Sequence, residues 1–158
     1  MNQNLPFEVL RQLRAQGKTL ATAESCTGGL IAKSITDIPG SSAMFFGACV
    51  TYTNEIKAKL LGVDPEIFER ESEVSVACAE AMALGARERL GTTYALSTTG
   101  YAGPGGGTDE KPVGLVYIGI ALKNSDSKAI KNIFKGDRDE VRTSTVCKAL
   151  ELVLEALR

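Results

Sequence analysis

Short apolar segments alternate along this chain with longer segments of helical periodicity. Candidate strands span residues 19–23, 45–52, 94–99, 113–122 and 129–134, and candidate helices span 5–16, 29–38, 54–61, 75–90 and 137–158. Such alternation is typical of a layered α/β domain, because helices must cover the apolar faces of a sheet. The last two strands lie too close in sequence for a helical crossover, so we expect an antiparallel hairpin through residues 124–126. The pattern therefore predicts a mixed sheet.

Length and charge narrow the class of protein. A chain of 158 residues fits one domain, spanning residues 1–158, and its hydrophobic content of 44% is ordinary for a globular protein. The net charge of −1 gives no reason to expect nucleic-acid binding. The first residues lack the basic patch and apolar run that are typical of a signal peptide, and no stretch reaches the roughly 18 apolar residues of a membrane span. We expect a cytoplasmic protein with neither a nucleic acid nor a membrane as partner.

The cysteines give no metal or disulfide pattern. The chain has four of them, Cys26, Cys49, Cys78 and Cys147, and it has no histidine. Without a Cys-x-x-Cys pair or a histidine, neither a zinc site nor a disulfide scaffold is indicated. We expect reduced thiols, no metal and no cofactor.

Ser25 stands between the strand at 19–23 and the helix at 29–38, beside the glycine pair Gly28-Gly29. Hydrolases often place a nucleophilic serine on such a turn, where backbone N–H groups bind an oxyanion or a phosphate. A serine needs a base, and without histidine that base must be lysine, a carboxylate or a tyrosinate. Cys26 is the alternative nucleophile, although a thiol also needs a base.

A second glycine-rich run, residues 100–107, follows the third strand. Glycines such as Gly100, Gly103 and Gly105 let backbone amides approach a ligand closely, as Gly28 and Gly29 would in the first loop. Neither run has the spacing of a P-loop or of a dinucleotide fingerprint. In the plainer interpretation these glycines only make turns.

Two arginines lie at the start of the last helix. Asp137 suits a helix N-cap, and Arg138 and Arg142 are spaced to share one helix face. Two guanidinium groups at a helix start can clamp a phosphate or carboxylate. Spacing alone favours the alternative, a solvated face paired with Asp139 and Glu140.

Candidate bases for Ser25 follow the second strand. If the first two strands are parallel neighbours, Tyr52 and Lys57 reach the same sheet edge as Ser25. A lysine with its pKa lowered by desolvation can accept a proton, and a tyrosine can relay it. Spacing alone again favours the plainer interpretation, a solvated Lys57 and a core Tyr52.

Four motifs occur in one order along nearly the whole chain. They are Thr22-Ala23-Glu24-Ser25-Cys26-Thr27-Gly28-Gly29, Val50-Thr51-Tyr52-Thr53-Asn54-Glu55-Ile56-Lys57, Gly100-Tyr101-Ala102-Gly103-Pro104-Gly105-Gly106-Gly107 with Lys111-Pro112-Val113-Gly114, and Gly136-Asp137-Arg138 with Arg142. This series resembles the carboxyl-terminal domain of the CinA, or competence-damage-inducible, protein family. The amino-terminal domain of longer members has no counterpart here, so we expect the stand-alone form.

The resemblance implies an α/β fold of three layers, α/β/α, around a mixed, mostly parallel five-strand sheet. It implies a nicotinamide-nucleotide amidohydrolase that converts nicotinamide mononucleotide to nicotinate mononucleotide and ammonia, with Ser25, Tyr52 and Lys57 as catalytic residues. We expect substrate contacts from the residues that the motifs place around them: Thr27, Gly28, Gly29, Gly100, Gly103, Gly105, Arg138 and Arg142.

One departure from the family pattern lies within the third motif. Tyr101 occupies a position where we expect a smaller residue, which affects the substrate loop. The alternative function is a non-catalytic nucleotide-binding or regulatory module, although such a module has no need of Ser25, Tyr52 and Lys57. The alanine- and leucine-rich helices leave room for a homo-oligomer.

Overall fold

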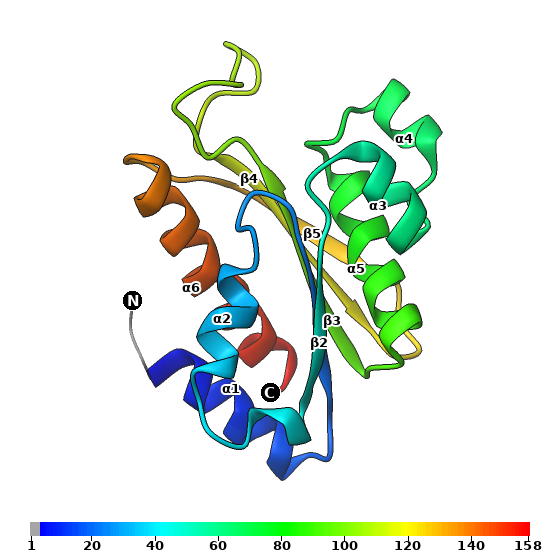
Figure 1. The fold of residues 1–158 in the computed structure, drawn as a ribbon, viewed down its shortest axis with the longest axis vertical. Coiled ribbons are helices and arrows are strands. Elements are labelled where there is room, and N and C mark those ends of the chain that lie inside the picture. The colour runs from blue at the N-terminus through cyan, green and yellow to red at the C-terminus, as the bar shows by residue number, and fades with distance from the viewer. Residues whose placement is uncertain (1–3) are drawn as a thin grey trace.

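A five-stranded sheet separates two layers of helices in the computed structural model, which describes residues 4–158 (Figure 1). The strands are β1 (Leu20–Glu24), β2 (Phe45–Val50), β3 (Tyr94–Gly100), β4 (Leu115–Leu122) and β5 (Lys128–Ile133). Their order is β2-β1-β3-β4-β5, with β1 parallel to β2 and β3, and β4 antiparallel to β3 and β5. The predicted mixed sheet and hairpin are confirmed.

The helices divide between the two faces of this sheet (Figure 1). One layer holds α1 (Asn4–Ala15), α2 (Leu30–Thr36) and α6 (Arg138–Ala156), and the other holds α3 (Asn54–Leu61), α4 (Pro65–Arg70) and α5 (Val76–Leu90). A short 3₁₀ turn, Ser41–Ala43, precedes β2. Each layer packs its own apolar cluster against the sheet, so the predicted three-layer α/β/α architecture is confirmed.

Side-chain caps fix where several helices begin. Ser75 accepts a hydrogen bond from the Cys78 amide at the start of α5, and Asp137 caps α6, as the sequence predicts. Thr53 is the N-cap of α3, since its hydroxyl accepts from the Ile56 amide. The helix α4 was not predicted, because it is too short to show periodicity.

Close backbone packing holds α3 against α5. A Cβ atom added at Gly85 of α5 would collide with the carbonyl oxygen of Leu61, so only glycine fits there. This contact brings α3, and with it Lys57, against α5. Gly85 therefore helps to position the candidate base.

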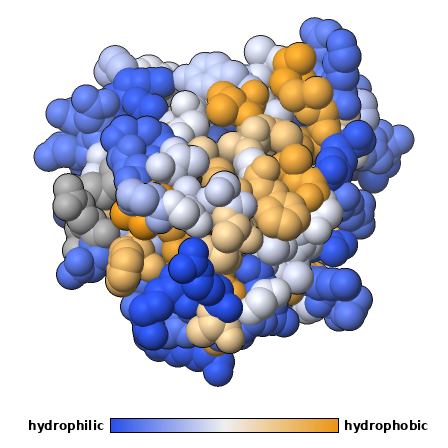
Figure 2. All heavy atoms as spheres, turned by 60° about the horizontal axis from the view of Figure 1, so that its bottom comes forward, coloured by the Kyte–Doolittle hydropathy of each residue, from blue (hydrophilic) through white to orange (hydrophobic). Residues whose placement is uncertain are grey.

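The surface combines polar regions with separate apolar ones. Figure 2 turns the bottom of Figure 1 toward the viewer and shows apolar side chains grouped among hydrophilic ones. The exposed large hydrophobic side chains are Phe7, Phe46, Val50, Tyr52, Leu60, Val76, Leu84 and Ile133. None of the helices in residues 4–158 has the length and apolar character to cross a membrane. The homo-oligomer and the cytoplasmic location stay predictions.

Candidate active site

Ser25 lies at the carboxyl edge of the parallel strands. The register pairs Glu24 of β1 with Val50 of β2 and with Thr98 of β3, and the Ser25 amide donates to the Thr98 carbonyl (2.9 Å). The ends of β1, β2 and β3 therefore meet at one place, where open α/β sheets bind their ligands. The prediction that the first two strands are parallel neighbours is confirmed.

A buried carboxylate holds the turn that follows Ser25. Glu24 is fully buried, and its oxygens accept hydrogen bonds from the amides of Gly29 (3.0 Å), Ile31 (3.0 Å) and Ala32 (2.9 Å). They also accept from the hydroxyls of Thr22 (3.2 Å) and Thr27 (2.7 Å). Negative charge at a helix N-terminus is stabilised by the helix dipole and by these donors. Glu24 thus fastens α2 to β1 with Ser25 between them.

Ser25, Tyr52 and Lys57 line one cavity of about 170 Å³. Its other lining residues are Cys26, Glu73, Val74, Thr99, Gly100, Tyr101, Ala102 and Arg138. Within residues 4–158 no hydrogen bond joins the side chains of Ser25, Tyr52 and Lys57 to one another. Catalytic hydrogen bonds often tighten only once substrate binds, so the shared cavity is the significant observation.

Lys57 is the unusual group in this cavity, because its side chain is only 1% exposed. Burial lowers the pKa of its ammonium, and the nearby Cys78 and Glu73 only partly offset this effect. The alternative of a solvated Lys57 is therefore wrong. A lowered pKa favours the neutral amine, which is the form that can act as a base toward a serine hydroxyl.

The pKa of Cys26 shifts in the opposite direction to that of Lys57, although the cause is again burial. Burial raises the pKa of its thiol to about 11, so the thiol stays protonated near neutral pH. The Ser25 side chain is slightly more accessible, at 9% exposure for the residue against 6% for Cys26. These observations favour Ser25 over Cys26 as the nucleophile.

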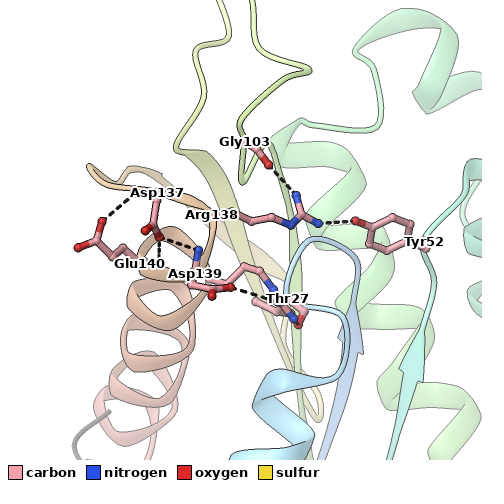
Figure 3. Close-up of polar contacts among 8 residues, drawn as sticks. Thr27, Tyr52, Gly103, Asp137, Arg138, Asp139 and Glu140 are labelled. Carbon is pink, nitrogen blue, oxygen red and sulfur yellow. Dashed lines mark hydrogen bonds and ion pairs between the residues drawn. The ribbon is translucent and has the colours of Figure 1, made fainter.

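Tyr52 and Arg138 meet at the mouth of the cavity (Figure 3). Tyr52 is 59% exposed, so the alternative of a core tyrosine is wrong. Arg138 donates to the Tyr52 hydroxyl (2.8 Å) and to the Gly103 carbonyl (2.7 Å). One guanidinium group thereby connects the start of α6 with the segment after β2 and the glycine-rich loop.

Arg142 contacts different residues from Arg138. It donates to the Thr27 carbonyl (2.8 Å) and lies 3.8 Å from an Asp139 carboxylate oxygen. Glu140, in contrast, completes a capping box by accepting from the Asp137 amide (2.8 Å). Arg142 thus supports the Ser25 turn from outside and does not line the cavity.

The predicted glycine contacts divide into several roles. The amide of Gly28 donates to the Ser25 carbonyl (3.1 Å) and that of Gly29 to Glu24, so both amides are occupied. Gly103 has a positive φ of 90° and offers its carbonyl to Arg138. Gly100 lines the cavity and packs closely on β4, whereas Gly105 is exposed and outside the cavity.

The segment between α4 and α5 forms one wall of the cavity, and no sequence motif predicts it. The Lys111 ammonium donates to the Glu71 carbonyl (2.9 Å), the Ser72 hydroxyl (2.6 Å) and the Val74 carbonyl (2.9 Å). The Thr99 hydroxyl donates to the Glu73 carbonyl (2.6 Å). These contacts place Glu73 and Val74 in the wall beside Lys57.

A larger cavity of about 580 Å³ lies between α1 and α2, away from these residues. Its polar groups are engaged with one another: Ser34 donates to the Ile31 carbonyl (2.7 Å), and Lys33 pairs with Asp37 (2.6 Å). The lysine there is exposed and ion-paired, unlike the buried Lys57 in the cavity of Ser25. The smaller cavity at the sheet edge is therefore the candidate active site.

The family model of the CinA C-terminal domain matches residues 2–157. A CinA-like protein of Myxococcus xanthus is 48% identical over 149 residues, which are 94% of this chain and 35% of that protein. A CinA-like protein of Synechocystis is 52% identical over 142 residues, 88% of this chain and 34% of that protein. The chain thus spans about a third of the length of these curated relatives.

Solved structures agree with the sequence relatives. The competence/damage inducible protein CihA from Agrobacterium tumefaciens superposes with a TM-score of 0.94 at 42% identity, covering 98% of this chain and 94% of that one. A CinA superfamily protein from Klebsiella pneumoniae superposes with a TM-score of 0.95 at 33% identity, covering 99% and 98%. Sequence and fold therefore agree that the chain belongs to the family of the CinA C-terminal domain.

Proposed function

We propose that this chain is a metal-independent amidohydrolase that converts nicotinamide mononucleotide to nicotinate mononucleotide and ammonia. The observation that carries the proposal is the buried Lys57, with its lowered pKa, in the same cavity as Ser25. The choice of substrate follows from the resemblance of the four sequence motifs to those of the CinA family. The pyridinium charge of this substrate makes its carboxamide electrophilic.

Acylation begins with neutral Lys57 as the base. Its amine takes the proton of the Ser25 hydroxyl, directly or through Tyr52, while Oγ attacks the carboxamide carbon. The tetrahedral oxyanion then collapses and the C–N bond breaks. The Lys57 ammonium returns its proton to the departing nitrogen, which leaves as ammonia, and the acyl group remains on Ser25.

Deacylation uses the same base a second time. Lys57, neutral again, removes a proton from a water molecule as that water attacks the acyl carbon. Collapse of this second oxyanion expels the Ser25 oxygen, which recovers the proton from Lys57. The products are the enzyme in its starting state and the carboxylic acid of the nucleotide, which releases a proton to water and becomes the carboxylate.

Backbone amides just after Ser25 are the proposed oxyanion donors. Within residues 4–158, the amides of Cys26 and Thr27 donate to no backbone oxygen, whereas those of Gly28 and Gly29 are occupied. An oxyanion donor typically contributes on the order of 10²–10³ in rate. Arg138, at the cavity mouth, is the proposed contact for the 5′-phosphate.

The test is ammonia release from nicotinamide mononucleotide by chelator-treated protein, compared with the variants Ser25→Ala and Cys26→Ala. We expect turnover by the wild type, loss of at least about 10³-fold in Ser25→Ala, and retained turnover in Cys26→Ala. Full activity of Ser25→Ala would contradict the mechanism. Binding of the nucleotide by a folded wild type without ammonia release would favour a non-catalytic nucleotide-binding module.

A further inference from the structure

Glu73 and Tyr101 are among the side chains of the cavity wall that have no part in the proposed mechanism. Both are half-buried. The Tyr101 ring lies beside Gly106, where an added Cβ atom would be 3.4 Å from Cδ1 of the ring. Tyr101 is also the residue that departs from the expected pattern of the third motif. Its large ring therefore shapes the cavity where a smaller residue was expected.

The backbone of Glu73 is fixed, but its carboxylate is not paired. Thr99 binds its carbonyl, and Lys111 binds the residues on either side. Across residues 4–158, the Glu73 carboxylate accepts no hydrogen bond and forms no ion pair. The fold thus places a negative charge in the cavity wall and leaves it without a protein partner.

The charge of Glu73 acts on its neighbours in the cavity. Burial raises the pKa of the Tyr101 phenol, and Glu73 raises it further. Burial lowers the pKa of Lys57, and the same carboxylate opposes that shift. Glu73 therefore lies within electrostatic reach of both side chains. The Lys111 ammonium binds the Ser72 hydroxyl and the Val74 carbonyl on either side, but within residues 4–158 it forms no ion pair with the Glu73 carboxylate.

The size of the cavity restricts what can balance this charge. At about 170 Å³ it is smaller than the roughly 300–1,000 Å³ typical of small-molecule sites, so it suits one ring with its substituent. A carboxylate and an aromatic ring together attract a flat cation, through Coulomb and cation–π interactions. The pyridinium ring of an oxidised nicotinamide nucleotide has this shape and charge.

We propose that Glu73 and Tyr101 form a subsite for a cationic aromatic ring, which selects oxidised nicotinamide nucleotides over reduced ones. This inference rests on the proposed function and deepens it, because it names the charge state of the ring that the site accepts. Arg138 at the cavity mouth would meet the anionic end of the same molecule. The subsite thus complements a substrate with a positive ring and a negative phosphate.

Calorimetric binding in the Ser25→Ala background separates recognition from turnover. The two ligands are nicotinamide mononucleotide and its reduced form, whose dihydropyridine ring is uncharged. We expect the oxidised ligand to bind about ten-fold more tightly. Adding Glu73→Gln should reduce this preference to about two-fold or less, whereas the matched control Glu71→Gln, an exposed carboxylate of the same segment, should retain it.

Each result decides the inference. Equal affinity for the two ligands, or an unchanged preference in Glu73→Gln, would overturn the subsite while ammonia release by the wild type leaves the proposed function standing. Failure of both ligands to bind, together with no ammonia release, would overturn both proposals.

The role of the Tyr101 ring is tested with two further variants. We expect Tyr101→Phe to keep the preference for the oxidised ligand and Tyr101→Leu to weaken it. Equal preference in the two variants would remove the ring from the subsite.

Discussion

The two walls of the cavity are built in different ways. On the Ser25 side, one buried carboxylate, that of Glu24, gathers five hydrogen bonds within a few residues of the chain. On the other side, the long side chain of Lys111 joins residues 71–74 to the loop at 101–114. The loop itself projects from the top of the molecule in Figure 1.

This difference separates the nucleophile from the part of the site that selects substrate. Groups that react must be held within a few tenths of an ångström, which a turn anchored by a buried carboxylate provides. Contacts with substrate tolerate more movement, and a loop held by a few side chains can change without disturbing Ser25. We therefore expect substitutions on the Glu24 side to affect folding and those on the Lys111 side to affect mainly activity.

Glu24→Ala tests the Ser25 side most severely. It removes the acceptor of the amides of Gly29, Ile31 and Ala32, which lie in half-buried or buried residues. We expect the free energy of unfolding to fall by about 3–5 kcal/mol, measured by urea denaturation. Glu24→Gln keeps one acceptor oxygen and should cost less, about 1–3 kcal/mol. The exposed Glu69→Gln serves as control, and a Glu24→Ala variant as stable as this control would disprove the anchoring role.

Lys57→Met should separate activity from stability. We expect a loss of about 10²–10⁴ in rate, because the base is removed. Stability at neutral pH should rise, since a buried ammonium no longer has to lose its proton or its hydration. The exposed lysine of the same helix, Lys59, provides the control Lys59→Met, which should change neither.

The pH dependence follows from the direction of the Lys57 shift. Its pKa is lower in the folded than in the unfolded chain, so the unfolded state binds more protons between the two values. The stability penalty of Lys57 is thus fully present below the folded pKa and disappears as pH rises toward the unfolded value. Activity should rise through the folded pKa, below the ordinary lysine value of 10.5, and a rate independent of pH there would contradict the role of base.

Lys111→Met tests the other wall and should have the smallest effect on stability. The loss of its bonds to Glu71, Ser72 and Val74 should lower the free energy of unfolding by about 1–2 kcal/mol. We expect kcat/KM to fall about ten- to 100-fold, because the Glu73 segment is displaced. Lys128→Met, an exposed lysine on β5, is the control. If stability falls without any change in kcat/KM, the segment does not position substrate.

Short sequence motifs predict the parts of this site that depend on residues close together in the sequence. Ser25 on its turn and the cap at Asp137 are both visible in short motifs. Tyr52 and Lys57 come to Ser25 because β1 and β2 are adjacent, which the alternation of elements allows but spacing alone does not decide. The burial of Lys57 depends on the packing of α3 against α5, so it could not be read from the sequence.

The missed features depend on contacts between distant residues. Glu73 belongs to no sequence motif. Its position follows from the hydrogen bond of Thr99 to its carbonyl and from the hydrogen bond of Lys111 to the neighbouring Val74 carbonyl. Glu24 lies within the first motif, but only the structure shows that its carboxylate accepts hydrogen bonds from amides of α2. The sequence did contain one signal for Glu24, a carboxylate at the end of an apolar strand.

Covalent labelling with a fluorophosphonate, followed by peptide mapping, tests the activation of Ser25 by Lys57 without assuming any substrate. We predict an adduct on Ser25 in the wild type, at a rate that rises with pH and falls at least about 100-fold in Lys57→Met. The Lys59→Met control should label at the wild-type rate. An adduct on Cys26, or equal labelling of Ser25 with and without Lys57, would contradict the account.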